Sequence, residues 1–327
     1  MDRLESDECP QTCNKHFKVS FLRHSQRLMV SYPFAARGMV LNAAMRGLWR
    51  IQDTIPISVA SDLDFEVSLN STCYWGESID TAPDLMVKMW SKSRENPRHV
   101  PRTMWLMESA SNESDGDVMD KLRAYVHDVP DLLVVAKILF KEATPYHSPG
   151  SKGSTVKRLR LSERMTQSEW ARYYVNPQEY LRVVVDDYTW FSLSSVEFHV
   201  WIRKPGESKI DLDSLSGDGY AFGLYPTVDF DDVDSAFQRS FELMKATILH
   251  DLPDVDLHDW LLPTRVIEPE DLVRALERGA WATAYHRYWH WHNRQKKRRR
   301  RTSRACASDE ASSPLNSVQL PNASGGD

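Results

Sequence analysis

The sequence predicts an α/β fold in which a mixed β-sheet is flanked by helices, and three observations lead to this prediction. Segments in which apolar and polar residues alternate, as they do in strands, occur in both halves of the chain. Segments with apolar residues at helical spacing lie between them. A continuous apolar run from Leu132 to Phe140 has the pattern of a central strand that is covered on both faces.

The first half of the chain is expected to hold most of the sheet. Alternation from Asp62 to Leu69 predicts a strand with Asp62, Asp64 and Glu66 on one face. The expected elements are, in order, a helix over 35–52, strands over 62–69, 84–90 and 104–110, a helix over 117–127 and a strand over 132–140. The segment from about 56 to 144 therefore has the order strand, strand, strand, helix, strand.

The second half is expected to add an α/β elaboration to the same domain. Thr166 and Glu169 have the spacing of a capping box that opens a helix. Residues 196–203 alternate strictly and end at a Lys-Pro-Gly turn, which predicts a strand. An apolar stripe over 231–250 predicts a long helix, and a last helix is expected from Pro269 to an aromatic stretch near Trp291.

These elements predict one α/β domain over 16–293 between two polar ends. Residues 1–15 are expected to form a flexible leader, and residues 294–301 form a basic run. Residues 302–327 lack aromatic side chains and are expected to be disordered, because they cannot bury enough apolar surface to offset the entropy of ordering. The stretch 144–155 contains proline and glycine and is expected to be a loop.

Composition excludes several classes of protein. The hydrophobic fraction of 41% and the charged fraction of 27% are those of a globular protein, not of collagen or a disordered chain. Four cysteines at irregular spacing are too few for a disulfide scaffold and indicate a reduced compartment. No signal-peptide pattern opens the chain, and the longest apolar run is far short of the roughly twenty residues that cross a bilayer. We therefore expect a protein of the nucleus or cytoplasm that does not enter a membrane.

Charge is distributed unevenly along the chain. The net charge is -5, yet the stretch from Arg294 onward carries eight bases and three acids. The basic run contains six consecutive basic residues, Lys296, Lys297, Arg298, Arg299, Arg300 and Arg301. Such a run is typical of a nuclear localisation signal, which predicts a nuclear import receptor as a partner. It could also contact nucleic-acid phosphates without sequence specificity, or be a solvated cluster with no receptor.

Two acidic residues at the ends of neighbouring expected strands form the main candidate site. Asp84 opens the strand over 84–90, and Glu108 lies near the end of the strand over 104–110. Carboxylates placed in this way can converge on one Mg²⁺ ion, which prefers oxygen ligands and keeps several waters. A metal there can polarise a phosphodiester and activate water. Lys121, early in the following helix, could place a positive charge beside the transition state.

Asp84, Glu108 and the order of the elements resemble the PD-(D/E)XK nuclease superfamily, which has the restriction-endonuclease-like fold. In the usual motif a lysine follows the second acid by two residues, and Ala110 stands there in this chain. The run that starts at Glu108 and continues to Lys121 and Tyr125 is similar to a branch found in bacterial restriction-endonuclease-like proteins. In that branch the lysine has moved to the next helix and a tyrosine follows it four residues later.

The resemblance implies roles for the matching residues. Asp84 and Glu108 would bind Mg²⁺ together with a backbone carbonyl near Ser109. Lys121 would orient the water or stabilise the transition state, and Tyr125 would support it. The superfamily often takes another acid from an earlier element. Either Asp64 or Glu66 is a candidate for it, and no spacing rule chooses between them.

Three hypotheses follow for the function. The first is magnesium-dependent hydrolysis of phosphodiester bonds in nucleic acid. The second is a catalytically inactive nuclear interaction protein with the same fold, which docks through the aromatic C-terminal helix. The third is an unrelated α/β fold, in which Asp84 belongs to a turn, Glu108 lies at an exposed strand end, and Lys121 and Tyr125 are surface residues.

Overall fold

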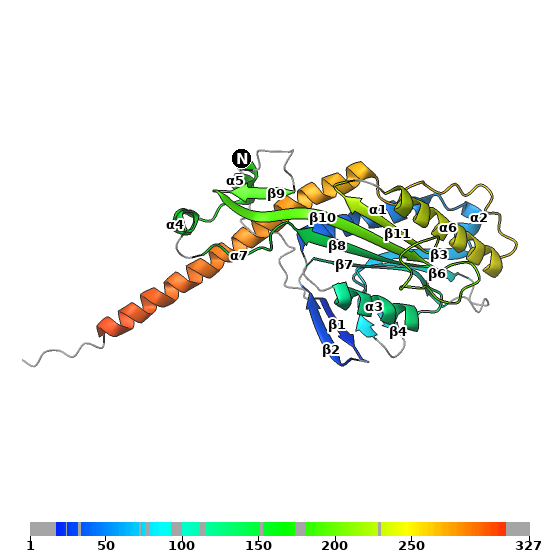
Figure 1. The fold of residues 1–327 in the computed structure, drawn as a ribbon, viewed down its shortest axis with the longest axis horizontal. Helices are drawn as coiled ribbons and strands as arrows, with labels where there is room; N and C mark the ends of the chain where they lie inside the picture. The colour runs from blue at the N-terminus through cyan, green and yellow to red at the C-terminus, as the bar shows by residue number, and fades with distance from the viewer. Residues whose placement is uncertain are drawn as a thin grey trace, which may run out of the picture.

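The computed structural model describes residues 18–311 apart from 24, 32–33, 72, 76–78, 93–99, 112–114, 151–152, 174–180 and 228–229 (Figure 1). The predicted leader over 1–15 and the last part of the predicted tail, residues 312–327, lie outside the described residues. The loop predicted over 144–155 is largely without regular structure, and a short helix begins at its end.

A mixed seven-stranded sheet forms the centre of the molecule, with the order β11-β10-β8-β7-β6-β3 and with β9 paired to β10. Its strands are β3 (Leu63–Leu69), β6 (Leu85–Ser91), β7 (Arg102–Ala110), β8 (Val134–Glu142), β9 (Arg182–Val185), β10 (Tyr188–Ile202) and β11 (Tyr220–Tyr225). The predicted α/β class with a mixed sheet and flanking helices is confirmed.

The strand directions follow from how the strands are connected. β3, β6 and β7 form an antiparallel meander, whereas β8 lies parallel to β7. Parallel neighbours need a crossover, which α3 (Asp115–Asp128) supplies. The predicted order strand, strand, strand, helix, strand is found in β3, β6, β7, α3 and β8. Three short elements that were not predicted, α2 (Ile57–Ala60), β4 (Cys73–Trp75) and β5 (Ile79–Thr81), lie in the same segment. β10 and β11 extend the sheet in antiparallel steps from β8.

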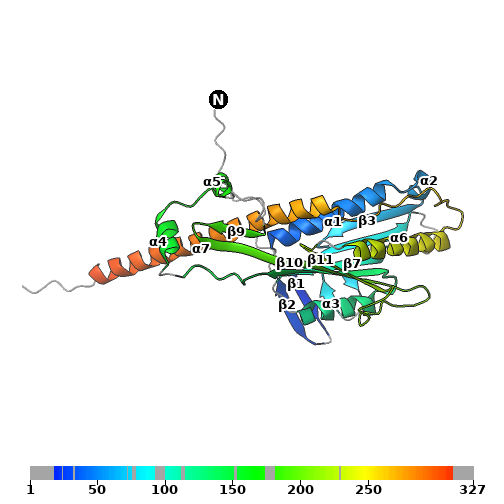
Figure 2. The ribbon, with the colours of Figure 1, turned by 45° about the horizontal axis from the view of Figure 1, so that its top comes forward.

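Helices cover both faces of the sheet. α1 (Ala35–Asp53), α6 (Asp231–Asp251) and α7 (Pro269–Ala311) pack over the larger core on one face, where Trp105 of β7 stacks on Phe237 of α6. α3 covers the other face and a smaller core that includes Leu106 and Leu122. Figures 1 and 2 both place α1 and α7 side by side, across the sheet from α3.

The close approach of α1 and α7 explains one glycine. A Cβ atom added at Gly279 of α7 would lie 2.3 Å from Cα of Ala36 in α1, far inside van der Waals contact. Only a residue without a side chain fits this crossing. The larger core is thus built around two helices whose backbones nearly touch.

A second, smaller sheet lies beside α3 (Figure 1). It has the order β2-β1-β5-β4, and its strands are β1 (Lys18–Leu22), β2 (Arg27–Ser31), β4 (Cys73–Trp75) and β5 (Ile79–Thr81). β1 and β2 form an antiparallel hairpin, and β1 also pairs with β5 through Phe21 and Leu22. The sequence did not predict this sheet, because its strands have only three to five residues.

Three short helices complete the fold, α2 (Ile57–Ala60), α4 (Ser154–Leu161) and α5 (Gln167–Arg172). The capping box predicted for α5 is confirmed. The Thr166 hydroxyl accepts a hydrogen bond from the backbone N–H of Glu169, and the Glu169 carboxylate accepts one from the backbone N–H of Thr166. The end of α5 packs Trp170 against Trp190 and Tyr288.

The C-terminal helix corrects one prediction. α7 continues through the basic run to Ala311, so the predicted disordered tail does not begin at 302. Residues 302–311 contain neither glycine nor proline, and nothing in them interrupts a helix. Within the aromatic stretch, Tyr288 and Trp291 are buried and pack edge-on against Trp190, whereas Trp289 is partly exposed. Beyond this contact the helix projects away from the sheets (Figure 1).

Candidate functional site

Asp84 and Glu108 lie next to each other on the face of the sheet that α3 covers. Leu85 pairs with Met107 in the antiparallel β6–β7 ladder, and this register places the residue before β6 at the level of Glu108. Asp84 is fully buried and Glu108 is 1% exposed. The prediction that the two carboxylates converge agrees with this arrangement, whereas an exposed strand end for Glu108 does not.

The Asp84 carboxylate accepts hydrogen bonds from four donor groups. Lys18 Nζ lies 2.7 Å from Oδ1, and Arg37 Nη2 contacts both oxygens. The backbone N–H and the hydroxyl of Ser109 donate to Oδ2 at 2.6 and 2.7 Å. Because an ionised carboxylate offers about four lone-pair positions, these donors fill it. The structure brings Ser109 to the site, as a donor through its N–H and hydroxyl.

Glu108 is held from two sides. The Tyr125 hydroxyl donates a 2.6 Å hydrogen bond to Oε1, and Lys18 Nζ lies 2.7 Å from Oε2. The Lys18 ammonium therefore bridges Asp84 and Glu108 and is shared equally by them. Two carboxylate oxygens thus face a single cation, which is the arrangement that a metal would require of them.

α3 supplies the two helical residues that the sequence predicted. Lys121 and Tyr125 are one turn apart, so they lie on the same face of the helix. Both are buried, at 1% and 0% exposure, and this face is turned toward the sheet. Tyr125 contacts Glu108 directly, as described above. The hypothesis that Lys121 and Tyr125 are surface residues is wrong.

The predicted extra acids, Asp64 and Glu66, are not at the site. They lie on β3, where Glu66 pairs with Lys88 and Asp64 with Trp90 of β6. Because β3 and β6 are antiparallel, these acids lie roughly 13 Å and 20 Å along the strands from the level of Asp84. The structure thus corrects the suggestion that either of them shares a metal with Asp84.

The charges around the site fix the protonation of its groups. Burial by itself would raise the pKa of Asp84, but the charges of Lys18 and Arg37 and the hydrogen bonds from Lys18 and Ser109 outweigh it and hold the pKa below its usual value. Burial, and then the nearby Glu108 charge, raise the pKa of the Tyr125 hydroxyl well above its usual value. At neutral pH, Asp84 is therefore a carboxylate and Tyr125 a neutral donor.

The carboxylates of Asp84 and Glu108 fit a magnesium ion on the condition that Lys18 withdraws. Asp84 Oδ1 and Glu108 Oε2 already face one cation, Lys18 Nζ, which marks the position that a metal would take. Two protein oxygens are enough for Mg²⁺, since it retains several waters. Lys18 and the metal cannot occupy this position together, so Lys18 would have to withdraw. Among the described residues no group of three or more histidine, cysteine or acidic side chains could hold a metal.

Sequence reasoning missed Lys18 and Arg37. Arg37 had a signal, because it stands within the apolar stripe of α1 formed by Ala36, Val40 and Leu41, where a charged residue needs a buried partner. Lys18 had none, since it opens a five-residue strand that was not predicted.

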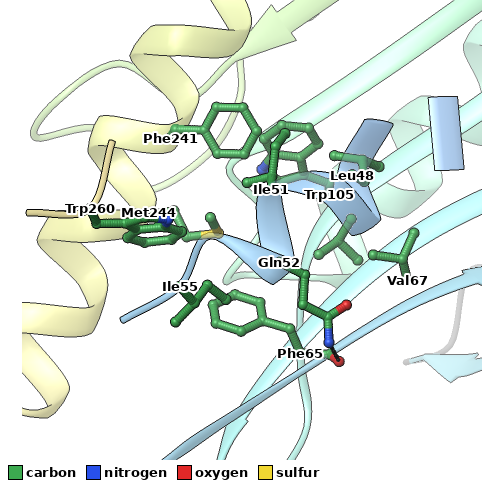
Figure 3. A pocket seen from close by; sticks show the side chains of 11 residues that line it. Leu48, Ile51, Gln52, Ile55, Phe65, Val67, Trp105, Phe241, Met244 and Trp260 are labelled. Carbon is green, nitrogen blue, oxygen red and sulfur yellow. Dashed lines mark hydrogen bonds between the residues drawn. The ribbon is translucent and has the colours of Figure 1, made fainter. Parts of the chain in front are cut away.

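An apolar pocket on the other face of the sheet offers no comparable chemistry (Figure 3). It lies between α1, α6 and strands β3, β6 and β7, and its lining includes Phe65, Trp105 and Trp260. Its single polar side chain, Gln52, donates to the carbonyl oxygen of Phe65 at 3.1 Å. The pocket belongs to the larger core.

No described helix is both long enough and apolar enough to cross a membrane. Comparison of the chain with protein-family models, with curated proteins and with solved structures finds no match. The candidate site therefore rests on its own geometry.

Proposed function

We propose that this chain is a metal-dependent nuclease that hydrolyses phosphodiester bonds in nucleic acid, with Asp84 and Glu108 as the ligands of Mg²⁺. One observation carries the proposal: oxygens of both carboxylates lie 2.7 Å from the same cation, Lys18 Nζ. Two buried acids arranged around one positive charge form a pre-shaped cation site. The order of β3, β6, β7, α3 and β8, which is the order that suggested the PD-(D/E)XK resemblance, also supports it.

The surrounding residues suit the roles that the resemblance implies. Ser109 orients the Asp84 carboxylate through its N–H and hydroxyl, and Tyr125 fixes Glu108 through Oε1 so that Oε2 faces the shared cation. Lys121 adds a buried positive charge on the same face of α3, where it can stabilise charge that develops on a phosphoryl group. The metal would supply the activation of water and the polarisation of the phosphodiester.

The end of α7 carries the basic run, which in this proposal has two roles, nuclear import and attraction of the nucleic-acid substrate. Lys296 and Lys297 are exposed on a helix that projects from the body, and the helix continues through the four arginines that follow. In this proposal the basic run serves as a nuclear localisation signal read by an import receptor. It also adds attraction to phosphates, which depends on salt and not on sequence.

A second candidate function is an inactive nuclear interaction protein of the same fold, and the basic residues of the site favour it. Lys18 and Arg37 balance the charges of Asp84 and Glu108, and the Asp84 lone pairs are filled without a metal. Both carboxylates are also buried, so in this conformation solvent does not reach them. In this alternative the ion network replaces the metal permanently.

A plasmid-cleavage assay with Mg²⁺ or Mn²⁺ separates the two candidates. The nuclease proposal predicts metal-dependent cleavage that is lost in Asp84→Asn and in Glu108→Gln. Asp64→Asn and Glu66→Gln are matched controls, because these acids lie on the same face but away from the site. Cleavage that survives in Asp84→Asn would overturn the nuclease proposal. So would the absence of cleavage, with either metal, by both the folded wild-type protein and a folded variant that lacks the Lys18 charge.

A further inference from the structure

We infer that the β1–β2 hairpin is an autoinhibitory plug, in which Lys18 occupies the metal position and must leave before a divalent cation can bind. This inference rests on the proposed function, since it concerns access to the same pair of carboxylates. It goes further by assigning a regulatory role to residues outside the predicted nuclease core. The two carboxylates would then be in place to bind a metal, but Lys18 would block the metal position.

The first support is that the acids and the cation between them belong to different structural units. Asp84 and Glu108 lie at β6 and β7 of the seven-stranded sheet, whereas Lys18 lies on β1 of the small sheet. In the described part of the chain β1 pairs with β2 and β5 and with no strand of the large sheet. Movement of the hairpin can therefore remove Lys18 without breaking the ladder that holds the acids.

The second support is the position of the ammonium group. Lys18 Nζ bridges the two acids at 2.7 Å from each, and Arg37 contacts Asp84 from α1. Lys18 thus stands where a shared metal must stand. Magnesium ligands lie at about 2.0–2.1 Å, so the ion would need the same space and would be repelled by an ammonium left nearby. Arg37 can remain and keep Asp84 ionised.

The third support is how the hairpin is attached. Arg27 of β2 makes ion pairs with Asp117 and Asp120 of α3 at 2.8 and 3.0 Å, and these side chains are partly exposed to solvent. Exposed ion pairs are weak and are screened by salt. Near Lys18, the buried attachments include the hydrogen bond between the Ser20 and Thr81 hydroxyls and the side chain of Leu22, and β1 also pairs with β5. The exposed ion pairs between the hairpin and α3 can therefore be removed by a single substitution that leaves Lys18 and the two acids unchanged.

Binding of Mn²⁺ alone, measured by titration calorimetry on the full chain, tests the plug without an activity assay. Lys18→Met keeps the apolar stem and removes the charge. We expect it to lower the dissociation constant for Mn²⁺ at least about tenfold, which corresponds to about 1.4 kcal/mol. Lys141→Met is the matched control, since Lys141 pairs with Glu197 elsewhere on the sheet and its loss should leave Mn²⁺ affinity unchanged.

A second variant covers the case in which Lys18→Met does not fold. Arg27→Ala leaves the Lys18 side chain unchanged but removes the ion pairs between the hairpin and α3. It should lower the dissociation constant for Mn²⁺ severalfold. Its control is Arg274→Ala, because Arg274 forms an exposed ion pair with Asp271 within α7, away from the hairpin. In the wild-type protein, Mn²⁺ should speed hydrogen exchange of the β1 amides.

The outcomes distinguish the plug from the proposed function. If the wild-type protein binds Mn²⁺ through Asp84, but Lys18→Met and Arg27→Ala bind it no more tightly and β1 exchange is unchanged, the plug is wrong and the metal site stands. If neither the wild-type protein nor a folded variant binds Mn²⁺, the metal site is wrong and the plug with it.

Discussion

The Tyr125 hydroxyl donates a 2.6 Å hydrogen bond to Oε1 of Glu108, and this contact joins α3 to the strand that it crosses over. Both groups are buried, so neither can exchange its partner for bulk water. The contact leaves Oε2 of Glu108 for Lys18, and hence for a metal in the proposed function. Tyr125 is therefore a positioning residue for the carboxylate.

Replacing Tyr125 by phenylalanine should destabilise the protein by about 1–3 kcal/mol, because it leaves a buried carboxylate oxygen without its donor. Chemical denaturation followed by circular dichroism measures the change. Tyr173→Phe is the control, since Tyr173 is 52% exposed and its variant should unfold like the wild-type protein. Equal stabilities for Tyr125→Phe and the wild-type protein would contradict the buried contact.

Replacing Asp84 by asparagine should cost about 3–5 kcal/mol, because it leaves Lys18 and Arg37 near an uncharged group inside the protein. The pKa of Asp84 lies below its usual value of 3.8 in the folded state. A lowered acid pKa contributes stability that is present above the unfolded value and is lost as the pH falls toward the folded one. The stability difference between the two proteins should therefore be constant from about pH 7 down to about pH 5 and shrink below pH 4. A difference that grows on acidification would contradict this assignment.

The elements between residues 35 and 142 show what the sequence could predict. α1, β3, β6, β7, α3 and β8 were predicted to within about two residues, because their apolar positions repeat at the period of a helix or strand. The carboxylates at Asp84 and Glu108 and the α3 residues Lys121 and Tyr125 were predicted as well. Which of these residues share a face of a strand or helix depends only on their spacing in the sequence, so it could be predicted.

The basic half of the site could not be predicted in this way. Lys18 meets Asp84 across 66 residues of sequence and Arg37 meets it across 47, and no periodicity links positions so far apart. The β1 strand that carries Lys18 has five residues and is stabilised by pairing with β2, which also has five, and with β5, which has three. Its formation depends on tertiary pairing more than on local preference.

Two glycines in the packed helix pair should respond oppositely to alanine. Gly279→Ala places a Cβ atom 2.3 Å from Cα of Ala36, so α1 and α7 must separate, and we expect a loss of about 2–3 kcal/mol or more. Gly38→Ala in α1 meets nothing within 4 Å and should stabilise the protein by about 0.5–1 kcal/mol, since alanine favours the helix. Thermal unfolding of both variants checks the pair, and equal effects would contradict the close approach.

Asp234, near the start of α6, should make stability depend on pH in the direction opposite to Asp84. Burial raises its pKa to about 6, although Arg265 lies 3.0 Å away and opposes the shift. A raised acid pKa contributes stability that is complete below the unfolded value of 3.8 and is lost as the pH rises through about 6. Asp234→Asn removes the charge, so at pH 8 it should be more stable than the wild-type protein by about 1–2 kcal/mol once solvent screening is allowed for.

The same comparison at pH 4 should show little difference, because Asp234 is then largely protonated in the folded wild-type protein. Asp232→Asn is the matched control in the same helical turn, and Asp232 is exposed. It should lose a few tenths of a kcal/mol at pH 8, because a negative charge near a helix N-terminus is favourable. If Asp234→Asn were destabilised at pH 8 like this control, the ion pair with Arg265 would outweigh the cost of burial, and the raised pKa would be wrong.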